Sequence, residues 1–372
     1  MPQEAQQKDR AERTDPVGHR RSGPAMLDQP GFGPKRLVKH LIYSTWIGNK
    51  LFGVLRPLII RRVMVMLAVT YRCVCKCKHC GVQGSRDNAR DEMDTAEMLR
   101  LVDQLGKLRT KIGSVYLFGG EPLMRHDLMD IIHRSKDHGF KIVLDTNGAF
   151  LDEAMADRLA EARVERVRVS LDSAIPEHHD ANRGMPGLYE KALRGARLTR
   201  ARGLWTELST FCTPEKIESG EVADLKRVAR ENGLNGVRIL STICSGAFAN
   251  LRPLSTESEK KLHELLEPGF AYYETPAIDT PNYKFRCFSM LKGHFFVSPY
   301  GDVQPCCVVP AAFGNLRDEP LQDILDRMWQ HPFYASGADT CPMNRPETHA
   351  WIKSLPTDGD PRQGPTRNRM HP

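Results

Sequence analysis

Regular alternation of strands and helices from residue 63 onward constrains the fold of this chain more than any other feature. Amphipathic helical stretches such as TAEMLRLVDQLGKL and HDLMDIIHRSKDH separate six short runs rich in β-branched and aliphatic residues. The expected strands span residues 63–70, 114–120, 141–147, 166–172, 205–211 and 236–242. Parallel strands are joined by right-handed crossovers, so six such repeats predict an α/β fold with a parallel sheet, curled into a full or partial barrel.

Two of the expected strands alternate between a polar and an apolar face. Side chains two residues apart point to the same side of a strand. Arg168, Ser170 and Asp172 therefore share one face, as do Asp145 and Asn147 in the preceding strand. The interior of an ordinary barrel is filled by Val, Ile and Leu. We therefore expect these polar faces to line the inside of the barrel and to hold a polar ligand.

The segment CVCKCKHC, residues 73–80, follows the first expected strand and contains four of the ten cysteines. Thiols this close together favour a metal over disulfides, and nothing else in the chain is typical of a secreted protein. Cys73, Cys77 and Cys80 have the spacing C-x3-C-x2-C. Zinc would take a fourth ligand from Cys75 or His79, whereas a [4Fe–4S] cluster on three thiolates leaves one iron open to another molecule.

A second unusual sequence, GGEP, follows the second expected strand at residues 119–122. Gly119 and Gly120 permit close backbone approach, and Glu121 offers a carboxylate to a cationic group. Active sites in folds of this kind gather at the C-terminal ends of the strands. The cysteine segment and GGEP are therefore expected to lie side by side.

The three-cysteine segment after the first strand, together with GGEP after the second, resembles the radical SAM superfamily, whose members bind S-adenosylmethionine (SAM) at a [4Fe–4S] cluster. The resemblance covers about residues 63–245 and implies a partial (β/α)6 barrel. It implies that Cys73, Cys77 and Cys80 bind three irons and that SAM chelates the fourth, with Cys75 outside the ligand set. The further implied contacts to SAM are His79 near the adenine, Gly119, Gly120 and Glu121 at the amino group, Asn147 and Ser170 at the ribose or carboxylate, and Arg183 at the carboxylate.

The resemblance also implies a reaction. An electron from the cluster cleaves SAM into methionine and a 5′-deoxyadenosyl radical, which abstracts a hydrogen atom from a substrate. We therefore expect a radical SAM oxidoreductase, supplied by an electron donor such as flavodoxin or ferredoxin. The expected substrate is a small natural-product precursor or other metabolite that is dehydrogenated or epimerised, because residues 1–62 lack the strand pattern of a leader-peptide-binding domain. The alternative is a maturase that modifies a ribosomal peptide.

A second set of cysteines, Cys287, Cys306 and Cys341, lies near the C-terminus. The run HFFVSPYGDVQPCC predicts a hairpin that turns at residues 300–302, and it resembles the SPASM/twitch extensions, which hold auxiliary Fe–S clusters. The chain has too few cysteines for two such clusters. The resemblance therefore implies one auxiliary [4Fe–4S] cluster, with Cys307, Cys244, a non-cysteine group or substrate as the fourth ligand.

Cys212 and Cys244 follow the fifth and sixth expected strands. Either thiol is a buried packing residue or a hydrogen-atom donor to a substrate radical. Four histidines are expected to be solvated and receive no role, namely His126, His133, His178 and His179. A zinc-stabilised binding protein without catalysis is the alternative from a different class. It explains the clustered cysteines but neither GGEP nor the polar strand faces.

The net charge of +7 lies in residues 1–62, which hold 12 of the 53 Lys and Arg and 5 of the 46 Asp and Glu. The rest of the chain is balanced, so no groove for nucleic acid is expected. Arg56, Arg61 and Arg62 interrupt the most hydrophobic run, which argues against a transmembrane span. No signal peptide is visible, so a cytoplasmic location is expected.

These features divide the chain into six expected segments. The segments are a disordered basic tail (1–34), a basic amphipathic helical segment that is a candidate for peripheral membrane contact (35–62), a radical SAM core (63–250), a linker with a helix (251–281), a SPASM/twitch-like Fe–S domain (282–351) and a disordered tail (352–372).

Overall fold

The structure is a computed structural model that describes residues 62–82, 91–243, 254–274, 287–337, 341–355 and 368–369. The predictions for the N-terminal segments 1–34 and 35–61, for Cys244 and for most of the C-terminal tail lie outside the described residues. Within those ranges, no helix combines the length and the apolar character needed to cross a bilayer.

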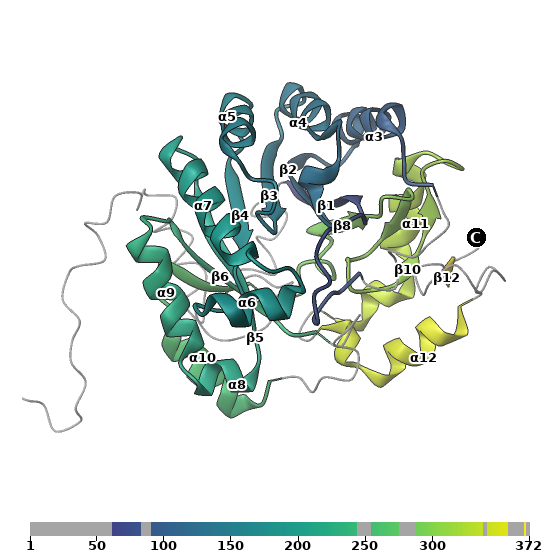
Figure 1. The fold of residues 1–372 in the computed structure, drawn as a ribbon. Coiled ribbons are helices and arrows are strands. Elements are labelled where there is room, and N and C mark those ends of the chain that lie inside the picture. Colours follow the sequence, from purple (N-terminus) through teal and green to yellow (C-terminus); the bar gives the residue numbers. More distant parts are fainter. Residues whose placement is uncertain are drawn as a thin grey trace, which may run out of the picture. The chain divides into compact units, whose positions relative to one another are not determined.

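One ten-stranded sheet organises the described residues, in the order β11-β9-β8-β1-β2-β3-β4-β5-β6-β7 (Figure 1). The strands from β8 through β1 to β7 are parallel, while β8, β9 and β11 pair antiparallel. The order has two free ends, so the sheet is open, and the predicted partial α/β barrel is confirmed. The strands are β1 (Val63–Thr70), β2 (Ile112–Gly119), β3 (Lys141–Thr146), β4 (Arg166–Ser170), β5 (Thr206–Cys212), β6 (Gly236–Ser241), β7 (Ala271–Glu274), β8 (His294–Val297), β9 (Asp302–Gln304) and β11 (Gly314–Asn315), with a separate pair β10 (Ala311–Ala312) and β12 (Asn368–Arg369).

Helices follow most of the parallel strands, and α3, α4, α5 and α7 lie next to one another over β1–β4 (Figure 1). The start of α3 is set by a capping box, in which the Asp94 side chain accepts from the Glu97 amide and the Glu97 side chain accepts from the Asp94 amide. The helices are α3 (Thr95–Lys107), α4 (Leu128–Asp137), α5 (Glu153–Glu161), α6 (Pro176–Arg183), α7 (Leu188–Ala201), α8 (Pro214–Glu218), α9 (Glu221–Glu231), α10 (Thr256–Leu265), α11 (Leu321–Gln330) and α12 (Pro346–Ser354), with short 3₁₀ turns at Pro122–Met124, Pro332–Ser336 and Pro342–Asn344.

The two faces of β4 differ as the sequence predicts. Val167, Val169 and Leu171 are buried in the main hydrophobic cluster, together with apolar residues of the helices. Arg168 lies on the other face of the strand, where it contacts charged residues of β5. The inner face of the sheet is therefore polar at this strand.

The predicted C-terminal hairpin is also confirmed, and it joins the main sheet. Strand β8 pairs with β9 in antiparallel register, with Phe296 opposite Gln304. Gly301, with φ of +87°, closes the turn between the two strands. Strand β8 also pairs in parallel with β1, so this region extends the sheet of the core. The boundary between a core and an Fe–S domain remains a prediction.

Two elements differ from the sequence-based expectations. Strand β7 (Ala271–Glu274) lies in the segment expected to be a linker, and it pairs with β6. Helix α12 continues to Ser354, into the segment expected to be a disordered tail.

Candidate active site

The cysteine loop, residues 71–82, leaves the C-terminal end of β1 and is held from two sides. On one side, the Gly120 amide donates to the Thr70 carbonyl at 2.8 Å and the Glu121 amide donates to the Arg72 carbonyl at 2.9 Å. On the other side, the Lys76 amide donates to the Arg183 carbonyl at 2.8 Å, at the C-terminal end of α6. The loop thus uses carbonyl groups that the helix end leaves without partners inside the helix.

Gly119 and Gly120 are required by the close approach of two backbone segments. A Cβ atom on Gly119, which has φ of +141°, would lie 2.1 Å from the Thr70 carbonyl oxygen. A Cβ atom on Gly120 would lie 2.3 Å from the Arg72 carbonyl oxygen. The two glycines therefore let the segment after β2 contact the base of the cysteine loop. Their predicted contact with the SAM amino group remains a prediction.

Replacing Gly184 with Ala is expected to loosen the cysteine loop. Gly184 follows α6 with φ of +63°, and a Cβ atom there would lie 2.8 Å from the Lys76 carbonyl oxygen. The variant therefore combines backbone strain of about 1–2 kcal/mol with a clash against the loop. We expect a lower midpoint of thermal unfolding and less iron bound per chain after anaerobic reconstitution.

Gly187→Ala is the matched control. Gly187 has a similar φ of +75°, but no atom lies within 4 Å of the position that its Cβ would take. This variant should lose a similar amount of stability from strain while keeping its iron content. Equal iron contents in the two variants would show that the contact between Gly184 and Lys76 does not support the cysteine loop.

The thiols of the cysteine loop gather around Cys75, which is buried. Hydrogen bonds with Cys73 and Cys77, together with burial, raise the pKa of Cys75 well above the usual range. The hydrogen bond from Cys75, helped by Arg183 and opposed by burial, lowers the pKa of Cys77 to about 7. The side-chain nitrogen Nδ2 of Asn147 lies 3.2 Å from the Cys75 sulfur and 3.6 Å from that of Cys73.

In the described part of the chain, no three Cys, His, Asp or Glu side chains are arranged as the ligands of one metal ion. The chemistry of the cysteine loop nevertheless fits an iron–sulfur cluster, because four soft sulfur donors lie at one strand end. The ligand set itself remains a prediction.

Glu121 is fully buried at the end of β2. Its Oε1 atom accepts from Thr146 Oγ1 at 2.7 Å and from the Leu123 amide at 3.1 Å, while Oε2 accepts from the Asn147 amide at 2.7 Å. A carboxylate has about four acceptor positions, so one position on Oε2 remains. Burial raises the pKa of Glu121 to about 7, against the effect of these hydrogen bonds. A cation at the remaining position would favour the ionised form.

Asp172 and Arg183 form a buried, two-point ion pair beside the cysteine loop. Arg183 Nε and Nη2 each donate to Asp172 at 2.7 Å, and Nη1 lies 4.0 Å from the Cys77 sulfur. Burial alone would raise the pKa of Asp172, but Arg183, His79 and Lys216 together lower it to about 2. The predicted contact of Arg183 with SAM would have to use N–H groups that this pair leaves available, because a guanidinium carries five.

His79 lies at the same edge, between the ends of β4 and β5. Its ring stacks on Phe211 with 4.3 Å between centroids, and its Nε2 atom lies 3.6 Å from Asp172 Oδ2. Burial lowers the pKa of His79 to about 4, so the ring is neutral at pH 7. Ser170 ends β4 on the same face as Asp172. The SAM contacts assigned to His79, Asn147 and Ser170 remain predictions.

Two polar residues of this edge could not be predicted from the sequence. His179, expected to be solvated, is fully buried, and its Nδ1 accepts from the Asp172 amide at 3.0 Å. Lys216 is also buried; its ammonium group donates to the Asp172 carbonyl and lies 3.9 Å from the centroid of the Phe211 ring. No periodic signal marks either residue, because His179 is the single buried residue of a polar helix.

Cys212 occupies the opposite face of β5 from Phe211 and packs in the main hydrophobic cluster. Burial raises the pKa of its thiol to about 12. This position favours a packing role over hydrogen-atom donation to a substrate on the inner face.

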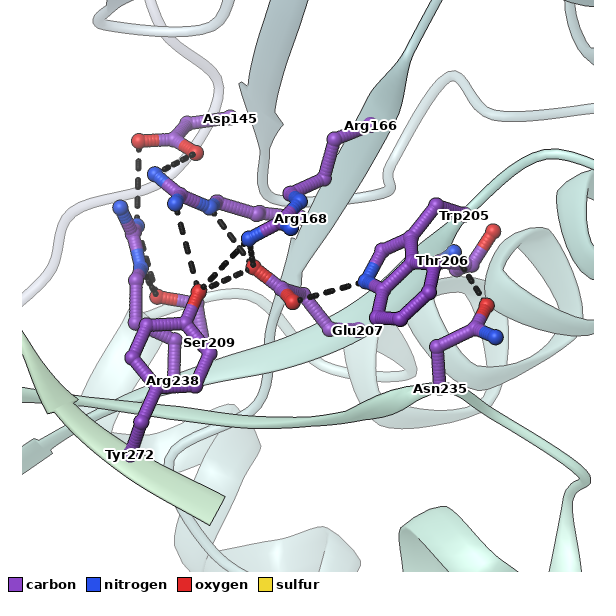
Figure 2. Close-up of polar contacts among 10 residues, drawn as sticks. All are labelled: Asp145, Arg166, Arg168, Trp205, Thr206, Glu207, Ser209, Asn235, Arg238 and Tyr272. Atoms are coloured by element: carbon purple, nitrogen blue, oxygen red, sulfur yellow. Dashed lines mark hydrogen bonds and ion pairs between the residues drawn. The ribbon is translucent and has the colours of Figure 1, made fainter. Parts of the chain in front are cut away.

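A second polar layer lies deeper on the inner face of the sheet, and we call it the arginine layer (Figure 2). Arg168 Nε donates to Glu207 at 2.8 Å, and Tyr272 Oη donates to the same carboxylate at 2.5 Å. Arg238 Nη2 donates to Asp145 at 3.0 Å and to Ser209 at 2.8 Å. The members of the layer are Asp145, Arg166, Arg168, Glu207, Ser209, Arg238 and Tyr272.

The arginine layer carries three guanidinium groups and two carboxylates, a formal excess of one positive charge. Arg168 lies on β4, and Asp172 follows it by four residues, beyond the last strand residue Ser170; extended chain of that length spans about 13 Å. The layer therefore lies below the edge that carries the cysteine loop.

The second cysteine set is buried in the C-terminal region. Cys306 and Cys341 belong to one small apolar cluster with Met343, and Cys287 lies near enough to Cys306 for their charges to interact. A hydrogen bond with Cys307, together with burial, raises the pKa of Cys306 well above the usual range. The structure thus brings at least two of the three predicted ligands together.

Residues 67–226 match the radical SAM superfamily, and residues 287–341 match the SPASM iron–sulfur cluster-binding domain. The order of the two matches is the one that the sequence predicted. The first match contains the cysteine loop and GGEP, and the second begins at Cys287 and ends at Cys341.

Two curated relatives cover most of the chain. An AdoMet-dependent heme synthase of Methanosarcina barkeri is 28% identical over 288 residues, which cover 70% of this chain and 81% of that protein. A PqqA peptide cyclase of Xanthomonas campestris pv. campestris is 29% identical over 282 residues, which cover 72% and 73% of the two chains.

Two solved structures share the fold. Streptococcus suis SuiB bound to the precursor peptide SuiA has a TM-score of 0.58 at 15% identity and covers 85% of this chain and 74% of its own. Native anSMEcpe with bound AdoMet has a TM-score of 0.55 at 18% identity, with coverages of 71% and 80%.

Proposed function

We propose that this chain, a member of the radical SAM superfamily with a C-terminal SPASM domain, removes a carbon-bound hydrogen atom from a small polar metabolite. A [4Fe–4S] cluster bound with SAM, once reduced, supplies the 5′-deoxyadenosyl radical that performs this abstraction. The main supporting observation is the backbone contact between GGEP and the cysteine loop, in which the Glu121 amide donates to the Arg72 carbonyl. It brings both motifs to one sheet edge.

Within this proposal the residues of the edge have distinct tasks. Cys73, Cys77 and Cys80 hold three irons, which leaves the fourth open to SAM. The buried pair of Asp172 and Arg183 fixes a guanidinium group 4.0 Å from the Cys77 sulfur, where it balances negative charge. The neutral ring of His79 offers an apolar face for a flat base.

Glu121→Gln is expected to weaken SAM binding about 10- to 100-fold, because it removes a charge-assisted hydrogen bond to the SAM ammonium worth about 1.5–3 kcal/mol. The open acceptor position on Oε2 is where that ammonium would bind. The measurement is a SAM titration of protein whose cluster content equals that of the wild type. Unchanged affinity at equal cluster content would mean that Glu121 only ties the end of β2 to the residues after β3.

The arginine layer supports a polar, anionic substrate. Its excess positive charge lies on the inner face of the sheet, below the proposed SAM site. This charge would attract a carboxylate on the substrate. Arg166 is the most exposed of the three arginines, with 30% of its side chain accessible, and is therefore the best placed to bind that carboxylate. The proposed reaction is dehydrogenation or epimerisation, with an auxiliary cluster available as electron acceptor and a flavodoxin or ferredoxin as donor.

A peptide substrate is the second candidate. It is supported by the relative named PqqA peptide cyclase and by the fold shared with SuiB, whose solved structure is bound to a precursor peptide. The relative named heme synthase supports a small molecule instead. The zinc-stabilised binding protein has no support from these comparisons.

Deuterium transfer distinguishes the two substrate classes. The reconstituted enzyme is given SAM, a reductant and an extract of cells grown on deuterated medium, and the deuterium in 5′-deoxyadenosine is measured. We expect transfer from the small-molecule fraction, both before and after the extract is digested with a protease. If protease digestion of the extract abolished deuterium transfer to 5′-deoxyadenosine, the substrate would be a peptide and not a small metabolite.

A further inference from the structure

The two faces of the β8–β9 hairpin differ in what they contact. Phe295, Val297 and Val303 belong to the main hydrophobic cluster. His294 and Gln304 lie on the opposite face, because side chains alternate along β8 and β9 and because Phe296 and Gln304 are paired across the two strands. Cys306 follows Gln304 by two residues. This face therefore points toward the second cysteine set.

His294, the first residue of β8, is buried beside the Cys306 thiol. It is 1% exposed; its ring hydrogen-bonds with that thiol, and among the described residues no further hydrogen-bond partner reaches Nδ1 or Nε2. The ring lies next to the Cys306 thiol and acts to lower its pKa, against the larger effects of Cys307 and burial. The Phe288 ring lies beside it, with 5.8 Å between centroids. Buried polar groups in native proteins are almost always satisfied, so this ring calls for a further bonding partner.

Other buried hydrogen-bond donors lie in the same region. Gln304 Nε2 lacks a partner among the described residues, while Tyr334 hydrogen-bonds with Ser289 and Trp329. Tyr334 lies near Trp329, and its hydroxyl is close enough to Cys287 and Cys306 to respond to their charges. An unsatisfied buried donor destabilises the fold. Sulfides and thiolates accept hydrogen bonds, so the residues present fit an iron–sulfur cluster bound at these cysteines.

We propose that a ring nitrogen of His294 is the fourth protein ligand of the auxiliary cluster, beside Cys287, Cys306 and Cys341. Three thiolates leave one iron without a protein ligand. Of His294, Gln304, Trp329 and Tyr334, His294 alone offers an imidazole nitrogen, the group that proteins use most often to bind iron and other metals. This inference rests on the auxiliary cluster of the proposed function.

Cys307 is the competing ligand within the described residues. It is only half-buried, and part of its surface packs against the aromatic cluster of Tyr71, Phe296 and Tyr300. Both Cys307 and His294 hydrogen-bond with the Cys306 thiol, so that contact does not separate them. His294 is the more deeply buried of the two and keeps a second ring nitrogen for a bond.

The test detects the iron–nitrogen bond directly. The full chain carrying Cys73→Ala, Cys77→Ala and Cys80→Ala is reconstituted, so that only the auxiliary cluster contributes a signal. The cluster is reduced without SAM, and nitrogen hyperfine coupling is measured by electron–nuclear double resonance on protein labelled with ¹⁵N-histidine. We expect the strong coupling of a directly bonded nitrogen. His294→Cys in the same background should abolish it while keeping about four irons per chain.

Two further readouts complete the test. Imidazole ligands raise the reduction potential of a cluster relative to thiolates, so His294→Cys should lower the midpoint potential. His331→Asn is the matched control, because His331 lies in the same region between Phe313 and Trp351 and should change neither coupling nor potential. Absence of strong nitrogen coupling, or a coupling that survives His294→Cys, would overturn the proposal.

Failure of this inference can be separated from failure of the proposed function. Wild-type enzyme that forms 5′-deoxyadenosine but shows no strong nitrogen coupling at the auxiliary cluster would contradict the role of His294 alone. Wild-type enzyme that forms no 5′-deoxyadenosine would contradict the proposed function, whatever the coupling shows.

Discussion

Replacing Cys73, Cys77 and Cys80 together with Ala is expected to abolish the formation of 5′-deoxyadenosine from SAM and to remove half of the bound iron. The three thiolates account for one four-iron cluster, and the C-terminal cysteines account for a second, so the wild type should bind about eight irons per chain and the triple variant about four. The loss of SAM cleavage should be complete, because no other group of the loop provides three thiolates at this spacing.

Cys75→Ala is the control for the triple variant. It removes a thiol of the same loop that the spacing C-x3-C-x2-C leaves out, and it also removes the hydrogen bonds of Cys75 to Cys73 and Cys77. SAM cleavage should remain largely intact. The ligand assignment would be contradicted if the triple variant still cleaved SAM, or if Cys75→Ala alone abolished both iron binding and cleavage.

Replacing Glu207 with Ala is expected to destabilise the protein by about 3–5 kcal/mol, because removing one partner of a buried ion pair leaves a buried charge without its nearest counter-charge. Glu207 and Arg168 are 1% and 2% exposed, and they are joined at 2.8 Å. The same carboxylate also accepts from Tyr272 at 2.5 Å and from Trp205 Nε1 at 3.2 Å. These donors would lose their acceptor as well. The midpoint of denaturant unfolding of the reconstituted protein measures the effect.

Two variants make the Glu207 experiment specific. Glu207→Gln keeps the shape and one carbonyl oxygen, so it should lose less stability than Glu207→Ala. Glu153→Ala breaks an ion pair with Arg194 in which both side chains are more than half exposed, and it should cost at most about 1 kcal/mol. If Glu207→Ala cost no more than Glu153→Ala, the arginine layer would contribute little to the stability of the fold.

Local pattern was sufficient to predict the six parallel strands of the core. Strand β1 was predicted with the bounds that the structure shows, and β3 differs by one residue, because dense aliphatic runs are bounded by polar turns. Strand β7 was missed because it is four residues long, AYYE, and pairs only at the edge of the sheet. A short strand of this kind depends on its neighbour more than on its own sequence.

Contacts between distant segments limited what the sequence predicted of the site. The alternation of side chains along β4 was sufficient to predict that Arg168 lies on the inner face. Its partner Glu207 could not be predicted in this way, because their contact depends on the register of β4 against β5. His179 looked solvated because the helix around it is polar, and only the packing of α6 against the end of β4 buries it. The pairing of β8 with β1 joins residues separated by more than two hundred positions, and no local signal reports such a contact.

A cluster on the cysteine loop should bind SAM and cleave it. A single-turnover reaction of the anaerobically reconstituted wild-type protein with SAM and dithionite tests this, with methionine and 5′-deoxyadenosine both quantified. We expect equal amounts of the two products, formed only by protein that carries the cluster. Intact SAM after full reduction of a fully loaded cluster would contradict it.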